Sequence, residues 1–304
     1  MTNTFTRKFP IKLFYGIIFI CSLSAALIFS EEISVGIIEG MNIAVHSIIP
    51  NTFVFAIVSD ALYSYVCLNG LGKIGKLFAR VFSVSEVSAS AILLGSFSGF
   101  PIGAMMLSQA HLNGKIAKEE AEYSLAPATS PSFIFCLSVL GELLGDKLMG
   151  INLYLICVLS SFITALCFKY KTSIILKTNV KQEQRFSLIN SIKKSALNSI
   201  YIIAFIIFFS AISSVLLFVL PKSFFSTFAV SILEIGKGVK LLSVYRSRYT
   251  FPALAFALSF TGISAMLQVK GFCEDALSIK RYLFMKTVSA AIALLISSLY
   301  VIIK

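Results

Sequence analysis

Residues 197–220 have the sequence LNSIYIIAFIIFFSAISSVLLFVL, without a single Asp, Glu, Lys or Arg. A helix that crosses a lipid bilayer needs about 20 mostly apolar residues, and this segment meets that requirement. Similar uncharged runs cover residues 13–30, 87–112, 149–168 and 249–269. A soluble protein can bury one such helix, but it cannot bury all of them. The sequence therefore predicts an all-α polytopic membrane protein with about seven spanning helices.

Composition and charge agree with a membrane protein. Apolar residues make up 57% of the chain and charged residues 13%, whereas a soluble domain carries roughly 25% charged residues. The formal net charge of +12 does not indicate nucleic-acid binding, because much of it lies in residues 169–194, where Glu183 is the single acid. A short basic loop between two spans is typical of the cytoplasmic side. The expected partner of this charge is the lipid bilayer, not nucleic acid.

The N-terminus and the metal-binding residue types add two further expectations. Basic residues precede the apolar run 13–30, which predicts a retained first helix with a cytoplasmic N-terminus, in a multi-pass protein of the cell membrane. The six cysteines lack metal-ligand spacing, and the two histidines, His46 and His111, are far apart. We interpret the cysteines as small hydrophobic residues and expect neither a metal site nor another cofactor.

The order of segments repeats along the chain. Within a single membrane domain over residues 1–304, we expect a first repeat over 40–168 and a second over 195–304. Each has a long helix, a broken hairpin, a broken helix and a closing helix. Charge placement predicts that 44–68 runs from outside to inside and 197–220 from inside to outside. The two repeats are therefore expected to be inverted relative to each other.

Inverted repeats with interrupted segments in matching positions indicate a transporter binding site. Non-helical backbone at membrane depth leaves N–H and C=O groups unsatisfied, so it is tolerated only where protein buries it or where it lines a watery cavity. The two re-entrant or broken hairpins expected here cover residues 87–112 and 223–243. Their tips would offer backbone groups and half-helix ends to a solute or ion.

Two interrupted segments in the first repeat carry candidate binding residues. Residues 95–104, GSFSGFPIGA, combine glycines, a proline and two serines. They favour a polar hairpin tip over a kinked helix that packs through small residues. Residues 128–132, ATSPS, begin the next span. They fit equally well a hydroxyl-lined cavity wall and a proline kink satisfied by Ser and Thr.

The second repeat contributes two matching segments. In residues 233–238, LEIGKG, Glu234 lies three residues from Lys237. Because a charge at membrane depth is costly, it usually marks a functional site. We therefore favour a functional Glu234 with Lys237 as its partner over an ion pair of the two residues that has no function beyond neutralising their charges. Residues 261–264, TGIS, with Gln268 one turn later, fit a binding wall and a helix–helix contact equally well. The candidate substrate-binding residues from all four segments are Ser96, Ser98, Gly99, Phe100, Pro101, Gly103, Thr129, Ser130, Ser132, Glu234, Gly236, Lys237, Thr261, Gly262 and Gln268.

The same segments resemble those of a known family. Residues 95–104, 130–134, 233–238 and 260–269 are similar, in order and spacing, to motifs of the YlbJ-type sporulation integral membrane proteins, within the nucleoside-recognition "gate" domain group. The resemblance covers roughly residues 40–270. It implies a sporulation-linked transporter that exports dipicolinate, a small aromatic dicarboxylate, across the outer forespore membrane.

Several functions stay open at this point. The leading expectation is transport of a small polar or anionic solute by alternating access, with Glu234 binding a polar group or a coupling cation, or with a proton as the coupling ion. A nucleoside or similar permease of the gate group is the alternative substrate class. A non-transporting sporulation assembly factor is an alternative of another kind. Formation of a homo-oligomer stays open for each of these functions. We expect no enzyme, because acids are sparse and the histidines are separated.

Overall fold

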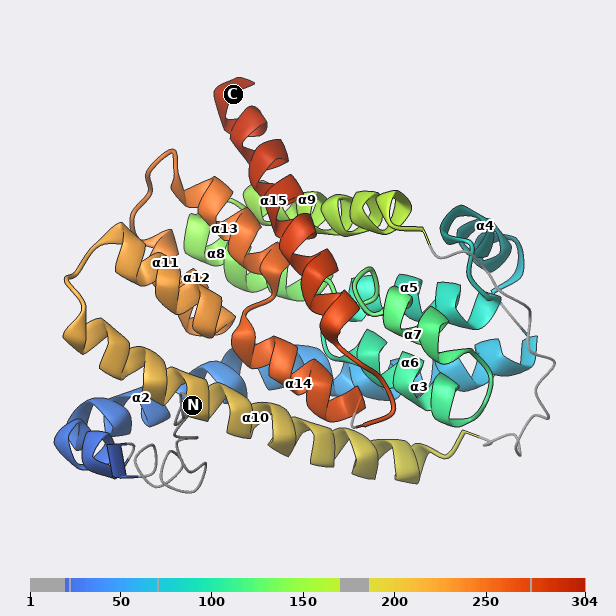
Figure 1. The fold of residues 1–304 in the computed structure, drawn as a ribbon, viewed down its shortest axis with the longest axis horizontal. Coiled ribbons are helices and arrows are strands. Elements are labelled where there is room, and N and C mark those ends of the chain that lie inside the picture. Colours follow the sequence, from blue (N-terminus) through green and yellow to red (C-terminus); the bar gives the residue numbers. More distant parts are fainter. Residues whose placement is uncertain (1–19, 22, 70, 170–185, 274, 304) are drawn as a thin grey trace, which may run out of the picture.

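The computed structural model describes residues 20–21, 23–69, 71–169, 186–273 and 275–303. Residues 13–19 and 22 of the expected N-terminal helix over 13–30, and residues 170–185 of the expected basic loop over 169–194, lie outside the described residues, while residues 20–21 and 23–28 are helical. The described chain is helical and contains no strand (Figure 1). Its elements are α2 (Ser30–Ile43), the π-helix η1 (Ala44–Ile48), α3 (Ile49–Asn69), α4 (Gly72–Phe82), α5 (Glu86–Ser98), α6 (Ile102–Leu112), α7 (Lys118–Ser124), the π-helix η2 (Phe135–Leu140), α8 (Gly141–Leu144), α9 (Lys147–Cys167), α10 (Leu188–Val219), α11 (Phe224–Leu233), α12 (Ile235–Ser243), α13 (Thr250–Phe260), α14 (Ile263–Cys273) and α15 (Lys280–Ile303).

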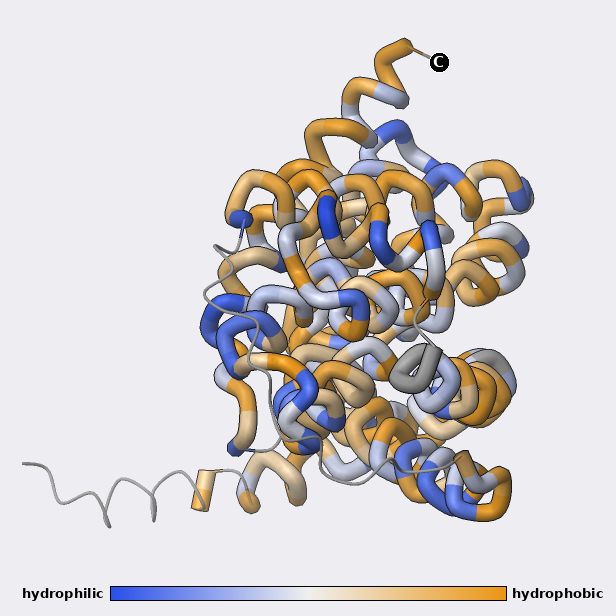
Figure 2. Tube along the Cα trace, turned by 90° about the vertical axis from the view of Figure 1, so that its right-hand side faces the viewer, coloured by the Kyte–Doolittle hydropathy of each residue, from blue (hydrophilic) through white to orange (hydrophobic). Residues whose placement is uncertain are grey.

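Four helical segments are long and apolar enough to cross a membrane within the described chain. They are α9, α10, α15 and the segment Thr250–Cys273, which joins α13 and α14. Two bent helix pairs raise the number to six at most. The expected count of about seven also included the first helix over 13–30, of which residues 13–19 and 22 lie outside the described residues. Large apolar side chains such as Leu197 and Phe208 of α10 are more than half exposed. Hydrophobic residues also predominate along the outer helices in Figure 2, so the apolar surface suits lipid.

The long helices of the two repeats lie antiparallel. Gly36 of α2 packs on Ser214 of α10, while Gly40 packs on Ser210. Further along α3, Asp60 pairs with Lys194 of α10. Contacts therefore move toward the start of α10 as α2, η1 and α3 proceed, as an inverted repeat requires.

The ends of the long helices differ in part from the sequence prediction. Glu31, Glu32 and Glu39, whose charge suits the outer side, lie within α2, which begins at Ser30 and continues through η1 into α3. The sequence also predicts a break at Pro50, and the helix does bend by 49° between Ile48 and Thr52, because proline lacks the N–H donor that a continuous helix needs. At the other long helix, Lys193 and Lys194 belong to α10 and not to a loop.

Both expected hairpins form, and each has two short helical arms. In the first, α5 ends at Ser98 and α6 starts at Ile102, with Gly95 and Gly103 facing each other across the arms. In the second, α11 and α12 meet at Glu234, and Gly238 packs on Ser231. The interruption of the second hairpin thus falls at Glu234, two residues before the glycine expected to make it.

Each repeat then continues with a broken helix. The first runs from α7 through the non-helical residues 125–132 into η2 and α8. The second runs from α13 into α14 and is interrupted at Thr261 and Gly262, both with positive φ. The closing helices are α9 and α15. In Figure 1, α2, α3 and α10 lie along one side of the molecule, and the hairpins and broken helices lie between them and α9.

Candidate functional site

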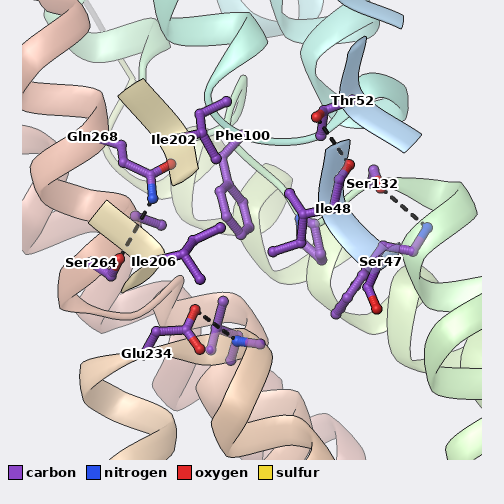
Figure 3. Close-up of a pocket in the computed structure, with 15 residues that line it drawn as sticks. Ser47, Ile48, Thr52, Phe100, Ser132, Ile202, Ile206, Glu234, Ser264 and Gln268 are labelled. Carbon is purple, nitrogen blue, oxygen red and sulfur yellow. Dashed lines mark hydrogen bonds between the residues drawn. The ribbon is translucent and has the colours of Figure 1, made fainter. Parts of the chain in front are cut away.

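A cavity of about 50 Å³ lies where both hairpin tips and both broken helices meet (Figure 3). Its polar lining consists of hydroxyl, amide and carboxyl side chains, and its apolar lining is aliphatic and aromatic. The lining residues are Ser47, Ile48, Thr52, Phe100, Pro131, Ser132, Phe135, Ile202, Ile206, Glu234, Ile235, Gly236, Ser264, Ala265 and Gln268. Every part of the inverted repeat except the closing helices contributes to this wall. A cavity of this size holds a few waters, so a larger solute needs the walls to move apart.

The first hairpin tip is held against the first helix break by backbone hydrogen bonds. Gly99 has φ +86°, a conformation that favours glycine, and it turns the chain between α5 and α6. The Phe100 N–H then donates to the Ser130 carbonyl at 3.1 Å. An added Cβ at Gly99 would lie 2.7 Å from the Ser132 side chain. This close fit places the Phe100 ring at the cavity.

The carbonyls freed by the first break have defined partners. The Pro127 carbonyl accepts from the Ser96 hydroxyl at 3.3 Å, and the Ala128 carbonyl packs against Gly95 and Gly103. The Thr129 carbonyl accepts from the Lys286 ammonium of α15. Since buried carbonyls without partners are costly, these contacts explain how a non-helical segment is tolerated inside an apolar domain.

Glu234 forms the tip of the second hairpin. Its carboxylate caps α12, because its two oxygens accept from the backbone N–H groups of Gly236 at 3.0 Å and Lys237 at 2.6 Å. A carboxylate is favoured at a helix N-terminus, where the free N–H groups and the helix dipole are positive. Glu234 is buried yet borders the cavity. Its remaining lone pairs are therefore oriented by the cap to accept a hydrogen bond from a solute.

The expected side-chain pair between Glu234 and Lys237 does not form. The Lys237 ammonium instead contacts Glu39 at 2.6 Å and the Ser214 hydroxyl at 2.5 Å. The backbone N–H of Lys237, and not its side chain, binds Glu234. The prediction of a paired acid and base failed because the short turn at Glu234 directs the carboxylate at the helix end, while Lys237 points out from α12 toward α2 and α10.

The second helix break packs on the second hairpin. Thr261 has φ +80°, unusual for a non-glycine residue, and Gly262 follows with φ +79°. Space for a Cβ at Gly262 is bounded by the Ile235 backbone at 3.5 Å. One turn into α14, Ser264 and Gln268 reach the cavity and lie 3.5 Å apart. Each hairpin tip therefore rests on the broken helix of its own repeat.

Two polar ties flank the cavity along α10. Ile202 and Ile206, which line the cavity, lie midway along this helix. At one end, the Lys194 ammonium binds Asp60 of α3 at 3.3 Å and Gln109 of α6 at 2.8 Å. At the other end, Ser214 and Glu39 hold Lys237 of α12. Each tie lies about 12 Å from the lining isoleucines, measured at 1.5 Å per residue.

The structure brings together one third of the candidate binding residues at the cavity wall. Phe100, Ser132, Glu234, Gly236 and Gln268 line it. The other candidates support the wall without lining it. Ser98 donates to or accepts from Ser59 of α3 at 3.0 Å, and the Thr129 hydroxyl bonds the Leu125 carbonyl at 2.8 Å. The residues that do not line the cavity are Ser96, Ser98, Gly99, Pro101, Gly103, Thr129, Ser130, Lys237, Thr261 and Gly262.

Sequence reasoning missed the lining from the long helices. Ser47 and Thr52 flank the junction of η1 and α3, and Ile202 and Ile206 come from α10. A π-helix inside an α-helix often marks a functional site, but nothing in the local sequence at 44–48 reveals one. The isoleucines are two among many in an apolar helix. Only the packing of α10 against the hairpins singles them out.

Comparisons with known proteins do not assign a family or a function to this chain. No family model matches the chain, and neither the curated proteins nor the solved structures give a significant match. The resemblance to the sporulation family therefore stays a prediction from the motifs.

The electrostatic character of the cavity limits what it can bind. Its lining includes one carboxylate and no lysine, arginine or histidine. Within the described part of the chain, no three His, Cys, Asp or Glu residues gather as metal ligands do. The arrangement can accept hydrogen bonds from a solute through Glu234 and exchange them with hydroxyls and Gln268. Phe100, Phe135 and the isoleucines offer an apolar surface to a ring.

Proposed function

We propose that this membrane protein transports a small polar solute by alternating access. The observation that carries the proposal is the meeting of both hairpin tips and both helix breaks at one cavity midway along α10. Interrupted segments of inverted repeats form the solute sites of many secondary transporters. A protein that only packs helices gains nothing from exposing four interruptions to one cavity, because each interruption costs helical hydrogen bonds.

The cavity supports an uncharged solute with a ring and several hydrogen-bonding groups, such as a nucleoside. Glu234 would accept from a sugar hydroxyl or a base N–H, while Phe100 and Phe135 would contact the ring. Charge-assisted hydrogen bonds of this kind contribute about 1.5–3 kcal/mol each. Selectivity against apolar molecules follows, since such molecules offer no hydrogen-bond donor to the lone pairs of the Glu234 carboxylate that the α12 backbone leaves free.

Dipicolinate is the second candidate, and it is the one that the sequence resemblance implies. Its aromatic ring suits the same walls. Its two negative charges do not suit Glu234, and Lys237 cannot offset them, because its ammonium binds Glu39 and Ser214. Export of dipicolinate across an outer forespore membrane is therefore less well supported than transport of a nucleoside. The proposed location in the cell membrane, with a cytoplasmic N-terminus, rests on the charge pattern of the sequence.

The flanking ties support a mechanism for alternating exposure. The Lys194 tie closes the α10, α3 and α6 side, and the Lys237 tie closes the α10, α2 and α12 side. Opening one tie while the other stays closed would expose the cavity to one side only. Rocking of the hairpins and broken helices against α2, α3 and α10 accomplishes this without unfolding any helix.

Thermal unfolding with a panel of solutes tests the proposal. A ligand that binds only the folded state raises the apparent stability by mass action. We expect uridine or adenosine to raise the unfolding temperature of the purified protein, and succinate to leave it unchanged. A shift with dipicolinate alone would replace the substrate assignment. No shift with any of these solutes in a well-folded sample would contradict transport of this class and favour the assembly-factor alternative.

Replacing Lys237 with methionine is expected to open the Glu39 side of the cavity. Loss of a partly buried ion pair worth about 1–3 kcal/mol changes an open-to-closed ratio by roughly 5–150-fold. Ser47→Cys, in a chain whose native cysteines are replaced by alanine, reports on access to the cavity. We expect a membrane-impermeant maleimide added from the Glu39 side to label this cysteine about tenfold faster in Lys237→Met.

Lys240→Met supplies the matched control for the opening experiment. Lys240 lies one turn further along α12 and is exposed, so its loss removes the same charge without touching the tie. Equal labelling rates in Lys237→Met and in the unsubstituted reporter would show that this tie does not close the cavity.

A further inference from the structure

Lys286 is a fully buried lysine on α15, outside the cavity wall. Its ammonium donates to the Thr129 carbonyl in the first helix break. No carboxylate within the described residues forms an ion pair with it. A charge at membrane depth is costly unless it is paired, and unpaired ionisable groups there often serve ion or proton movement. Neither the motifs nor the cavity assigns any role to this residue.

The titratable groups around Lys286 provide no compensating negative charge. Cys157 of α9 faces it, and Tyr282 lies one turn earlier on α15, fully buried. A thiol and a phenol are ordinarily neutral at physiological pH. From α7, Glu120 accepts from the Ser85 N–H and Glu122 from the Ser278 N–H, so both carboxylates are engaged elsewhere. Helix α13 has no charged residue.

A buried ammonium in these surroundings depends on the carbonyl that it binds. With the Thr129 carbonyl as acceptor, the charge is solvated by an amide dipole in place of water. If the break moves away, the ammonium loses that acceptor and the neutral amine becomes favoured, since desolvation disfavours the charged form. The protonation state of Lys286 is thus tied to the position of the first helix break.

The same break is connected to the solute cavity through adjacent peptide groups. Thr129 precedes Ser130, whose carbonyl accepts from the Phe100 N–H at 3.1 Å. Phe100 lines the cavity, and so do Pro131 and Ser132, the two residues that follow Ser130 in the chain. A solute that displaces the first hairpin tip therefore shifts the backbone that holds the Lys286 ammonium. The connection runs through four consecutive residues and one hydrogen bond.

We infer that Lys286 is a proton-binding site that couples solute movement to proton movement, an inference that rests on the proposed transport function. When the break is in the observed position, Lys286 holds the proton as an ammonium. When the break withdraws, the ammonium N–H bond breaks, the electron pair stays on the amine nitrogen, and the proton passes to water on the side then open. Reprotonation from the other side completes one cycle with one proton moved.

Proteoliposomes with two kinds of assay test the inference. Counterflow of radiolabelled uridine, with dipicolinate run in parallel, measures exchange without any driving gradient. Accumulation of the same solute under an imposed pH difference measures coupling to protons, and an equal sodium gradient serves as comparison. In the unsubstituted protein, we expect both counterflow and an accumulation of at least tenfold driven by the pH difference, with none driven by sodium.

Two variants separate a proton carrier from a structural tie. Lys286→Gln keeps an N–H donor for the Thr129 carbonyl but cannot release a proton, and Lys286→Met keeps the length and removes the donor. We expect Lys286→Gln to retain counterflow within about threefold and to lose accumulation driven by the pH difference. Counterflow also shows that a variant is folded. The result for Lys286→Gln therefore stands on its own even if the Lys286→Met protein does not fold.

The outcomes distinguish the inference from the function on which it rests. Absence of counterflow for both solutes in the unsubstituted protein would overturn the proposed transport and the inference with it. Counterflow without accumulation driven by the pH difference, or accumulation in Lys286→Gln equal to that of the unsubstituted protein, would overturn the inference alone. Accumulation that follows the sodium gradient would also overturn it.

Discussion

Replacing Glu234 with glutamine is expected to remove solute binding and to lower the unfolding temperature by roughly 4–8 °C, equivalent to about 2 kcal/mol. The carboxylate accepts two backbone N–H bonds at the start of α12, and an amide has only one oxygen to accept them. Its NH₂ group would face an N–H donor. Thermal unfolding of the purified variant, with and without uridine, measures both effects in one experiment.

Glu142→Gln is the matched control for this substitution. Glu142 is exposed on α8, and its carboxylate makes no hydrogen bond within the described part of the chain. It should unfold within about 1 °C of the unsubstituted protein and keep the full uridine shift. If Glu234→Gln also keeps the uridine shift, the carboxylate does not contribute to the solute site.

Replacing Gly103 with valine is expected to destabilise the protein by about 3 kcal/mol or more, and to reduce the yield of monodisperse protein sharply. A Cβ at Gly103 would overlap the Ala128 carbonyl, and this backbone group cannot rotate away as a flexible side chain can. Overpacking a well-packed interior costs about 1–3 kcal/mol even where side chains can adjust. Displacing α6 would also break the hydrogen bond between Phe100 and Ser130. Size-exclusion chromatography and thermal unfolding measure the loss.

Gly145→Asn tests whether any glycine substitution has this effect. Gly145 has φ +71° with open space around the position of a Cβ, and asparagine tolerates this left-handed conformation better than most residues. We expect little change in yield. Normal yield and unfolding temperature for Gly103→Val would show that the first hairpin does not depend on close contact with the helix break.

Local sequence was sufficient to locate the interruptions of the first repeat. Gly99 and Pro101 end α5 and start α6 where the glycine–proline pattern indicated, and residues 125–132 are non-helical around their two prolines. These features depend on backbone conformation and on missing N–H donors, which are properties of the residue itself. The membrane class follows in the same way, because the bilayer acts on each apolar segment separately.

Partners across the fold could not be predicted from the pattern. Lys237 was expected to bind Glu234, three residues away, but its ammonium binds Glu39 of α2. Lys286 was not recognised at all, because its acceptor, the Thr129 carbonyl, lies 157 residues earlier in the chain. A sequence pattern reports neighbours within a helical turn, whereas these contacts exist only once α12 packs on α2 and α15 packs on the first break.

The sequence by itself therefore determined that this chain is a membrane protein with paired, interrupted segments. Tertiary structure alone decided which of their residues reach the cavity, since Phe100 and Glu234 line it while Ser98 and Lys237 bind neighbouring helices. The physical reason is that hydropathy and helix breaking are local properties. The direction of a side chain toward a cavity depends on how the two repeats and α10 pack together.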